Sequence, residues 1–283
     1  MIDSHGFVVI WFILILYMAN LLRLSDQIPS YLTRIGIIHC SRHYLHDIVT
    51  PNSKRSSKHS VTAGRIQFKN ITFAYPDSKA PILKGFNLNV AGGEKVGILG
   101  TSGSGKTTAM KLLSGIYRPS KGTLKIDGHS INTIQTHHLR KNVVYINQRT
   151  QLFNTSILKN IQYGNRVSDK EVQALLNRYR LNDVYQKLPQ GIHTNAGVQG
   201  AGLSLGMQKV TMLLRGILRE GRIVVFDEPL AGLDAQTRKK ILRLIREQCK
   251  GKTTLVITHD TEIIPYMDRV VNMKRLNKVV SNQ

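Results

Sequence analysis

The residues with the clearest chemical meaning form one short segment, GTSGSGKT, from Gly100 to Thr107. It matches the G-x-x-x-x-G-K-[ST] phosphate loop and lies between an apolar segment, 95–99, and a segment with a helical pattern, 106–116. Glycines let backbone N–H groups curl around a phosphate, and a helix N-terminus adds positive potential. Lys106 can neutralise the β- and γ-phosphates, and the Thr107 hydroxyl can bind Mg²⁺. The segment predicts a nucleotide site; the alternative is a Gly/Ser loop with a solvated lysine.

The nucleotide-contacting residues predicted from this segment are Gly100, Thr101, Ser102, Gly103, Ser104, Gly105, Lys106, Thr107 and Thr108.

Two acidic residues end a second apolar segment, RIVVFDEP. Asp227 can hold the Mg²⁺ shell, and the adjacent Glu228 can polarise an attacking water molecule. Two acids at a strand end are common and mean little alone, but beside a phosphate loop they predict nucleotide hydrolysis. His259 ends the segment TTLVITH and is a candidate contact of the γ-phosphate, although a histidine at a strand end is more often structural.

Short strands and helices alternate along the chain from residue 65 onwards. Alternating or continuous apolar residues predict strands at 65–75, 82–90, 95–100, 142–147, 222–227 and 253–259. Helical patterns occupy 106–116, 170–186, 207–219 and 235–249. This alternation predicts an α/β domain around a largely parallel sheet.

The N-terminal region is apolar from Gly6 to Leu22, with Asn20 as its only polar residue. As a helix it would span roughly 25 Å, slightly less than the roughly 30 Å of a bilayer core. No lysine or arginine precedes it, which argues against a secretory signal, whereas Arg23 and Arg34 follow it. We therefore expect residues 1–25 to contain a transmembrane helix whose C-terminal side is cytoplasmic. A buried core helix is the alternative.

Residues 26–61 are basic and rich in serine, as expected of a solvated linker. The chain carries a net charge of +23, with 40 lysines and arginines against 17 acids, which favours polyanionic partners such as nucleotides, nucleic acid or an anionic membrane surface. Cys40 and Cys249 lie far apart without metal-type spacing, which favours reduced thiols in a cytosolic environment.

The order of these motifs resembles the ATP-binding cassette (ABC) ATPases, in particular the nucleotide-binding domain of exporter-type half transporters. The resemblance covers residues 62–283 and implies a P-loop cassette with a mainly parallel sheet, an antiparallel β subdomain and a helical signature subdomain, preceded by one apolar helix. It rests on the phosphate loop, the Asp227-Glu228 pair, the segment YINQRTQLFNTSILKNI, the AGLD segment at 231–234 and the placement of His259.

The resemblance also implies roles for individual residues. Tyr75 would stack on adenine, although it could instead be a core tyrosine of its strand, and Gln148 would contact Mg²⁺ and water. Asp234 would cross a dimer interface. In the family two cassettes dimerise head to tail around two ATP molecules, so Ser204 and Gly206 would contact the nucleotide of the partner.

The resemblance implies catalytic roles for Glu228, His259, Gln148 and Lys106. It implies that Thr107, Gln148 and Asp227 bind Mg²⁺. It also implies that ATP is bound by Tyr75, the phosphate loop, Ser204, Gly206 and Asp234.

The signature segment departs from the family pattern. The family has L-S-G-G-Q, whereas this chain has Leu203-Ser-Leu-Gly-Met207. We expect Ser204 to cap the helix, and the groups that face a phosphate are the Ser204 hydroxyl and the Gly206 N–H. Met207 removes a glutamine that could complete a capping box. The segment therefore predicts a slower site rather than an inactive one. Val198 also stands where the family usually has an acid, which puts the detail of coupling in doubt.

The sequence thus predicts an ATP- and Mg²⁺-dependent cassette subunit that powers export of an unidentified substrate at a membrane, with its ATPase domain on the cytoplasmic side. Its expected partners are a second cassette, identical or different, and a subunit that supplies further membrane helices; no nucleic acid is expected. One alternative is a non-transport ABC ATPase that acts on nucleic acid or ribosomes, which the high charge would suit. Another is an ATP-binding cassette with low turnover.

Overall fold

The computed structural model describes residues 11, 13–21, 60–76, 78, 80–147 and 151–277, in two units, Met1–Lys54 and Arg55–Gln283. In the first unit, residues 13–21 are helical and carry exposed apolar side chains. Among the described residues, no helix is both long enough and apolar enough to cross a bilayer. The predicted transmembrane helix at 1–25 and the linker at 26–61 lie largely outside the described residues and stay predictions.

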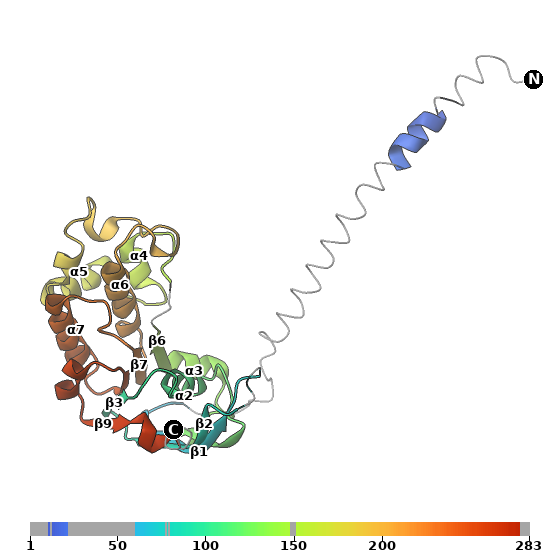
Figure 1. The fold of residues 1–283 in the computed structure, drawn as a ribbon. Helices are drawn as coiled ribbons and strands as arrows, with labels where there is room; N and C mark the ends of the chain where they lie inside the picture. Colours follow the sequence, from blue (N-terminus) through green and yellow to red (C-terminus); the bar gives the residue numbers. More distant parts are fainter. Residues whose placement is uncertain are drawn as a thin grey trace, which may run out of the picture. The chain divides into compact units, whose positions relative to one another are not determined.

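The second unit is built on a five-stranded parallel sheet (Figure 1). Its strands are β3 (Lys95–Leu99), β6 (Val143–Ile146), β7 (Ile223–Asp227), β8 (Thr253–Ile257) and β9 (Arg269–Asn272). They pair in the order β6-β7-β8-β3-β9, with every pair parallel. The carboxyl ends of all five strands therefore meet at one edge of the sheet, which is where open α/β sheets bind ligands.

A second, antiparallel sheet has the order β2-β1-β4-β5. Its strands are β1 (Ile66–Phe73), β2 (Leu83–Val90), β4 (Lys121–Ile126) and β5 (His129–Ser130). The implied antiparallel β subdomain is thus present. Of these four strands, the apolar alternation predicted β1 and β2, whereas KGTLKI at β4 has too few apolar residues to stand out.

A bulge in β1 explains why its apolar alternation breaks. Asn70 adopts a left-handed backbone with φ 51°, and the pairing with β2 shifts between Phe68 and Ile71. Phe68 and Ile71 are three residues apart and would otherwise point to opposite faces, yet both are buried. The bulge therefore keeps one face of the strand in the core.

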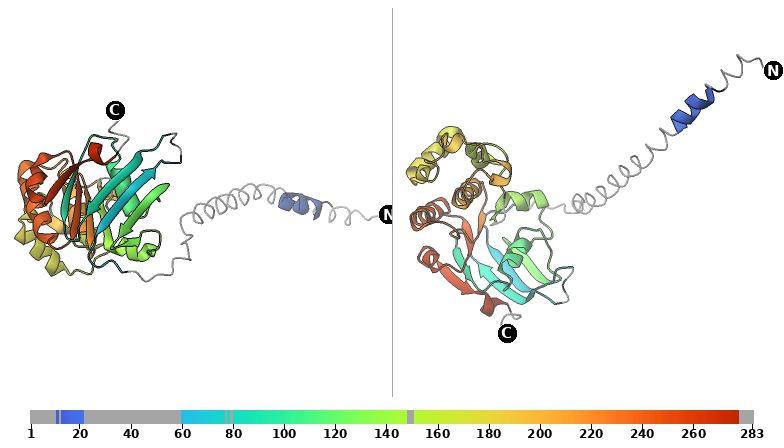
Figure 2. Two further views of the ribbon diagram at one scale, coloured as in Figure 1. Left: turned by 90° about the horizontal axis from the view of Figure 1, so that it is seen from below. Right: turned by 45° about the horizontal axis from the view of Figure 1, so that its top comes forward.

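Helices cover both faces of the parallel sheet (Figure 2). The helices are α2 (Lys106–Leu113), α3 (Thr136–Asn142), α4 (Ile157–Gln162), α5 (Asp169–Arg178), α6 (Leu205–Ile217), α7 (Ala235–Gln248) and α8 (Met273–Leu276), with short 3₁₀ turns at Leu181–Val184, Gly191–His193, Val198–Gly200 and Thr261–Tyr266. Helices α4, α5 and α6 gather at the end of the unit opposite to β1 and β2 (Figure 1).

Two apolar cores follow from the alternation of β7. Ile223 and Val225 belong to a core shared with α2 and the antiparallel sheet. Val224 and Phe226 belong to the other core, shared with α4 to α7. All four side chains are fully buried, so both faces of β7 are covered. Asp227, at its end, is held in place by packing from both sides.

The structure corrects two predicted helix boundaries. The helix predicted at 170–186 ends at Arg178, because Arg180 adopts φ 53°, which no right-handed helix can continue through; a 3₁₀ turn, Leu181–Val184, follows. The helix predicted at 106–116 ends at Leu113, and Gly115 takes φ 70° two residues later. Apolar periodicity does not register such local backbone reversals.

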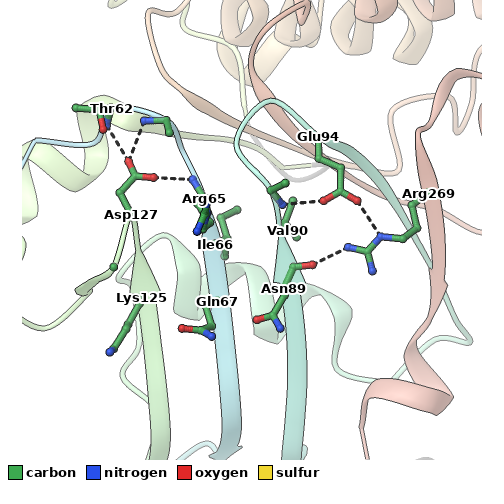
Figure 3. Close-up of a pocket in the computed structure, with 13 residues that line it drawn as sticks. Thr62, Arg65, Ile66, Gln67, Asn89, Val90, Glu94, Lys125, Asp127 and Arg269 are labelled. Carbon is green, nitrogen blue, oxygen red and sulfur yellow. Dashed lines mark hydrogen bonds and ion pairs between the residues drawn. The ribbon is translucent and has the colours of Figure 1, made fainter.

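One aspartate, Asp127, holds the backbone of residues 62–65, just before β1 (Figure 3). Asp127 Oδ2 accepts backbone N–H bonds from Thr62, Ala63 and Gly64 at 2.8, 3.1 and 3.1 Å, and its Oδ1 accepts one from Arg65 at 2.7 Å. These bonds close one wall of a hollow of about 860 Å³ at the end of the antiparallel sheet. Because backbone N–H groups already bond to both oxygens of this carboxylate, Asp127 positions the chain rather than a ligand.

Candidate nucleotide-binding site

The predicted phosphate loop lines a cleft of about 710 Å³ at the carboxyl edge of the parallel sheet. The loop follows β3, Asp227 ends β7, and His259 follows β8, so three segments far apart in the sequence converge there. The residues that line the cleft are Ile82, Gly100, Thr101, Ser102, Gly103, Ser104, Gly105, Lys106, Thr107, Thr108, Lys111, Asn147, Asp227, Glu228, Ala231, Ile257 and His259.

Two glycines give the loop its shape. Gly103 has φ 77° and open space where a side chain would stand, as needed if an anion approaches the backbone. Gly105 has φ 92° and caps α2, and a Cβ there would come within 2.7 Å of Leu83 Cδ2. Both positions are therefore unsuited to any residue with a side chain.

Lys106 is folded back onto this loop. Its Nζ donates to Gly100 O at 2.6 Å and to Thr101 O at 2.8 Å. Burial lowers the pKa of Lys106, and the carboxylates of Glu228 and Asp227 partly oppose that shift. The ammonium thus rests on two neutral carbonyls of the phosphate loop. From there it can turn to bind a phosphate held by the same loop.

Asp227 is held in a polar corner of the cleft, with 8% of its surface exposed. Its Oδ2 accepts a hydrogen bond from the Tyr145 hydroxyl at 2.7 Å and one from the Thr107 hydroxyl at 3.3 Å. Burial raises the pKa of Tyr145, and the hydrogen bond to the carboxylate raises it further, so the phenol remains a donor. Sequence reasoning missed Tyr145, a polar side chain in an apolar strand.

Glu228 is turned towards the end of β8. It adopts a left-handed backbone with φ 51°, a conformation that costs a residue with a side chain about 1–3 kcal/mol. Its Oε2 accepts a bond from the Thr258 hydroxyl at 3.1 Å, and its Oε1 lies 2.9 Å from His259 Nδ1. The two carboxylates therefore face different partners: Asp227 the phosphate loop, Glu228 the histidine.

These residues fit a nucleotide with one divalent cation. Within the described residues, no group of three or more His, Cys, Asp or Glu side chains could hold a metal ion alone. Thr107 Oγ1 and Asp227 Oδ2, however, lie 3.3 Å apart and are oxygen ligands of the kind Mg²⁺ prefers. Mg²⁺ usually takes only one or two protein ligands, and phosphate oxygens and water complete its shell. The third predicted ligand, Gln148, lies outside the described residues.

Tyr75 lies beside the phosphate loop rather than in the cleft wall. Its hydroxyl is 3.1 Å from Thr108 Oγ1, and its ring makes edge-on contacts with Phe73 and Tyr117, with centroids 5.1 and 5.2 Å away. Lys111 Nζ lies 5.6 Å from the centroid of the Tyr75 ring. The proximity suits the adenine contact implied by the resemblance, which stays a prediction.

Ser204, Gly206 and Asp234 lie elsewhere, around a second cleft of about 490 Å³. Ser204 caps α6, as predicted, and its Oγ accepts a bond from Met207 N at 3.3 Å. Leu205, which replaces the glycine of the family pattern, is 80% exposed. None of these residues lines the cleft of the phosphate loop in the same protomer.

Support for the signature segment comes from a residue that the sequence did not indicate. Gln208 Nε2 donates to Gly200 O and to Leu203 O, each at 3.0 Å. It thereby ties the turn before Ser204 to the helix after it. This differs from the role of the capping glutamine absent at Met207, whose side-chain oxygen would accept a bond from the Ser204 N–H.

Comparison with known proteins identifies the family. The family model described as ABC transporter matches residues 83–231, which include the phosphate loop, the signature segment and Asp227-Glu228. This chain belongs to the ABC transporter family. The resemblance inferred from its motifs is confirmed, as are the cassette fold and the presence of the family's ATPase domain.

Its relatives are considerably longer than this chain. The ATP-dependent lipid A-core flippase of Alkalilimnicola ehrlichii is 35% identical over 74% of this chain, which spans 36% of that protein. ABC transporter B family member 13 of Arabidopsis thaliana is 32% identical over 82% of this chain, and the chain spans 20% of that protein. A bacterial Atm1-family ABC exporter with ATP bound has a TM-score of 0.75 and 32% identity, with coverage of 90% of this chain and 46% of that chain.

Proposed function

We propose that this ABC transporter chain is an ATP-binding and ATP-hydrolysing cassette subunit that powers export across a membrane. The observation that carries the proposal is the convergence of Lys106 and Thr107 with Asp227, Glu228 and His259 in one cleft. A structural loop would not need a lysine, two carboxylates and a histidine at the same edge of the sheet. The exporter relatives support transport as the process that hydrolysis drives.

In this proposal each side chain has a distinct task. Lys106 leaves the carbonyls of Gly100 and Thr101 and binds the β- and γ-phosphates. Thr107 and Asp227 hold Mg²⁺, which when bound neutralises phosphate charge. Glu228 polarises the attacking water and accepts its proton, while His259 fixes the carboxylate and contacts the γ-phosphate.

The placement of Ser204 and Gly206 supports a dimeric form of the enzyme. A Cβ on Gly206 would meet only ordinary contacts, Leu233 Cδ2 at 3.9 Å and Gly232 O at 4.0 Å, so the space in front of Gly206 is open within one chain. The N-terminus of α6 can therefore receive a phosphate from a second cassette. Membrane helices of a partner subunit, and residues 1–25 of this chain, would place the dimer on the cytoplasmic side of a membrane.

The test compares ATP hydrolysis by the wild-type chain and by Glu228→Gln. The amide cannot accept the proton of water, so we expect turnover to fall by at least about 100-fold, with nucleotide affinity unchanged. Size-exclusion chromatography with Mg²⁺ and ATP should show the variant as a dimer and the wild type mainly as a monomer. A wild type as inactive as the variant would remove the enzymatic assignment, and an ATP-loaded variant that stays monomeric would remove the dimer.

A further inference from the structure

Tyr145 holds the carboxylate of Asp227 from the neighbouring strand. Its hydroxyl donates to Asp227 Oδ2 at 2.7 Å, the usual length for a hydrogen bond between two oxygens. The Thr107 hydroxyl donates to the same oxygen at 3.3 Å, which is longer than such bonds normally are. Tyr145 therefore provides the closer of the two contacts that fix this side chain.

The pairing of the strands brings the phenol to this place. Tyr145 lies opposite Val225 where β6 pairs with β7, and Asp227 stands two residues further along β7 on the same face. Two residues of a parallel strand rise by about 6.6 Å, a distance that a tyrosine side chain lying along the sheet can cover. The Tyr145 side chain packs against the core that α2 shares with the antiparallel sheet. Strand register and packing, rather than a loop, therefore set the position of the hydroxyl.

The other oxygen of Asp227 is left for a ligand. Within the described residues, Asp227 Oδ1 accepts no hydrogen bond, yet it is not fully buried. Asp227 lines the nucleotide cleft, whereas Tyr145 does not. The phenol thus acts on the carboxylate without occupying space that a ligand would need.

We propose that Tyr145 is a positioning residue for the metal site, which keeps the Asp227 carboxylate beside Thr107 and ready to receive Mg²⁺. The inference rests on the proposed function and adds to it the group that prepares a metal ligand. Because the phenol holds Asp227 by itself, the Thr107 hydroxyl can turn its oxygen to the cation while the carboxylate stays in place. Loss of a group that hydrogen-bonds to a metal-binding carboxylate typically lowers metal affinity by about 10- to 100-fold.

Removal of this hydroxyl should weaken nucleotide binding only when the metal is present. Tyr145→Phe keeps the ring and leaves the phosphate loop untouched, so the affinity for ATP in EDTA should not change. In saturating Mg²⁺ the affinity should fall by about tenfold, the lower end of the usual range, because Thr107 and the phosphates still hold the cation. A general packing defect would instead weaken both forms of binding.

The experiment measures the affinity of the full chain for a fluorescent ATP analogue, once in EDTA and once in saturating Mg²⁺. The control is Tyr185→Phe, which removes another phenol hydroxyl, 2.9 Å from Thr211 Oγ1, from a buried tyrosine that does not line the nucleotide cleft. It should leave both affinities unchanged. Thermal unfolding verifies that each variant folds, and Tyr145→Leu, which also lacks the hydroxyl, must lose the same response to Mg²⁺.

A double-mutant cycle tests whether Tyr145 acts through Asp227. Asp227→Asn should by itself remove most of the affinity that Mg²⁺ adds, and Tyr145→Phe should then cause no further loss. Additive losses in the double variant would place the effect of Tyr145 elsewhere and overturn the inference.

Equal affinities of wild type and Tyr145→Phe in saturating Mg²⁺ would also overturn it, as would equal losses with and without the metal. A failure of the proposed function looks different, because the wild type itself would then bind the analogue in neither condition, or equally well in both.

Discussion

At the residue scale, the carboxylates of this chain are specialised by what surrounds them. Asp227 faces two hydroxyls, Glu228 faces a hydroxyl and an imidazole, and Asp127 faces four backbone N–H groups. Only the first two lie in the nucleotide cleft. The environment, rather than the residue type, therefore separates the carboxylates that line the cleft from the one that holds the backbone.

Asp127 gives a stability prediction with a definite pH dependence. Burial acts to raise the pKa of Asp127, but the bonds from Gly64, Arg65, Thr62 and Ala63 together hold it below its ordinary value. A carboxylate with a lowered folded-state pKa stabilises the fold above its unfolded pKa of about 3.9, and that contribution is lost as the pH falls through the folded value. Asp127→Asn should lower the free energy of unfolding by about 1–3 kcal/mol at neutral pH.

Urea unfolding of wild type and Asp127→Asn, from neutral pH down towards about pH 3.5, measures this effect, and the difference should shrink with acidification. Glu220→Gln, an exposed carboxylate-to-amide change without a hydrogen-bonded partner among the described residues, is the control. A constant difference across this range would contradict the assignment.

At the scale of elements, α6 and the turn before it form one unit. The Ser204 cap and the two bonds from Gln208 join residues 200–204 to the first turns of the helix. Gly200 has φ 88°, and a Cβ there would come within 3.1 Å of Gln208 Cδ. The side chain of Gln208 thus fills the inside of the turn as well as bonding to it.

Gln208→Ala should loosen this unit without disturbing the phosphate loop. We expect a loss of about 1–2 kcal/mol in the free energy of unfolding and a several-fold lower turnover of ATP, because two hydrogen bonds disappear. Nucleotide affinity should be unchanged, since Gln208 does not line the cleft of the phosphate loop. Stopped-flow turnover, nucleotide titration and urea unfolding test the three parts, with the exposed Gln190→Ala as control. Undiminished turnover in an equally destabilised variant would show that the turn does not matter for hydrolysis.

At the scale of the whole molecule, the net charge is compatible with two classes of polyanionic partner. The net charge of +23 suits either a nucleic acid or an anionic membrane surface. Membership of the ABC transporter family and the exporter relatives favour the membrane. The positive charge would then serve to hold the ATPase unit against the lipid headgroups.

Co-sedimentation with lipid vesicles tests this interpretation. The chain should bind vesicles that contain phosphatidylserine more strongly than neutral ones, and the difference should vanish as salt rises from about 0.1 M to 0.5 M, because screening shortens the reach of the charges. Binding that persists at high salt on both kinds of vesicle would come from the apolar residues of 1–25. Equal binding to neutral and anionic vesicles at low salt, or tighter binding to RNA than to either, would contradict the prediction.

Much of the nucleotide site could be read from the sequence, because its parts are contiguous or stand at the ends of recognisable strands. The phosphate loop, the Asp227-Glu228 pair and the Ser204 cap need only local backbone geometry, and the chemistry follows from the residue types. For the same reason the family and the α/β class were predictable.

Other features depend on contacts that no local pattern encodes. Tyr145 reaches Asp227 across 82 residues of sequence, and Asp127 reaches Thr62 across 65. Lys209 is polar in a helix that periodicity identifies, yet its burial follows only from the way α6 packs in the fold. The sequence by itself thus determined which groups can do the chemistry. Tertiary structure alone decided which further groups surround them, because burial and charge balance are properties of packing between distant segments.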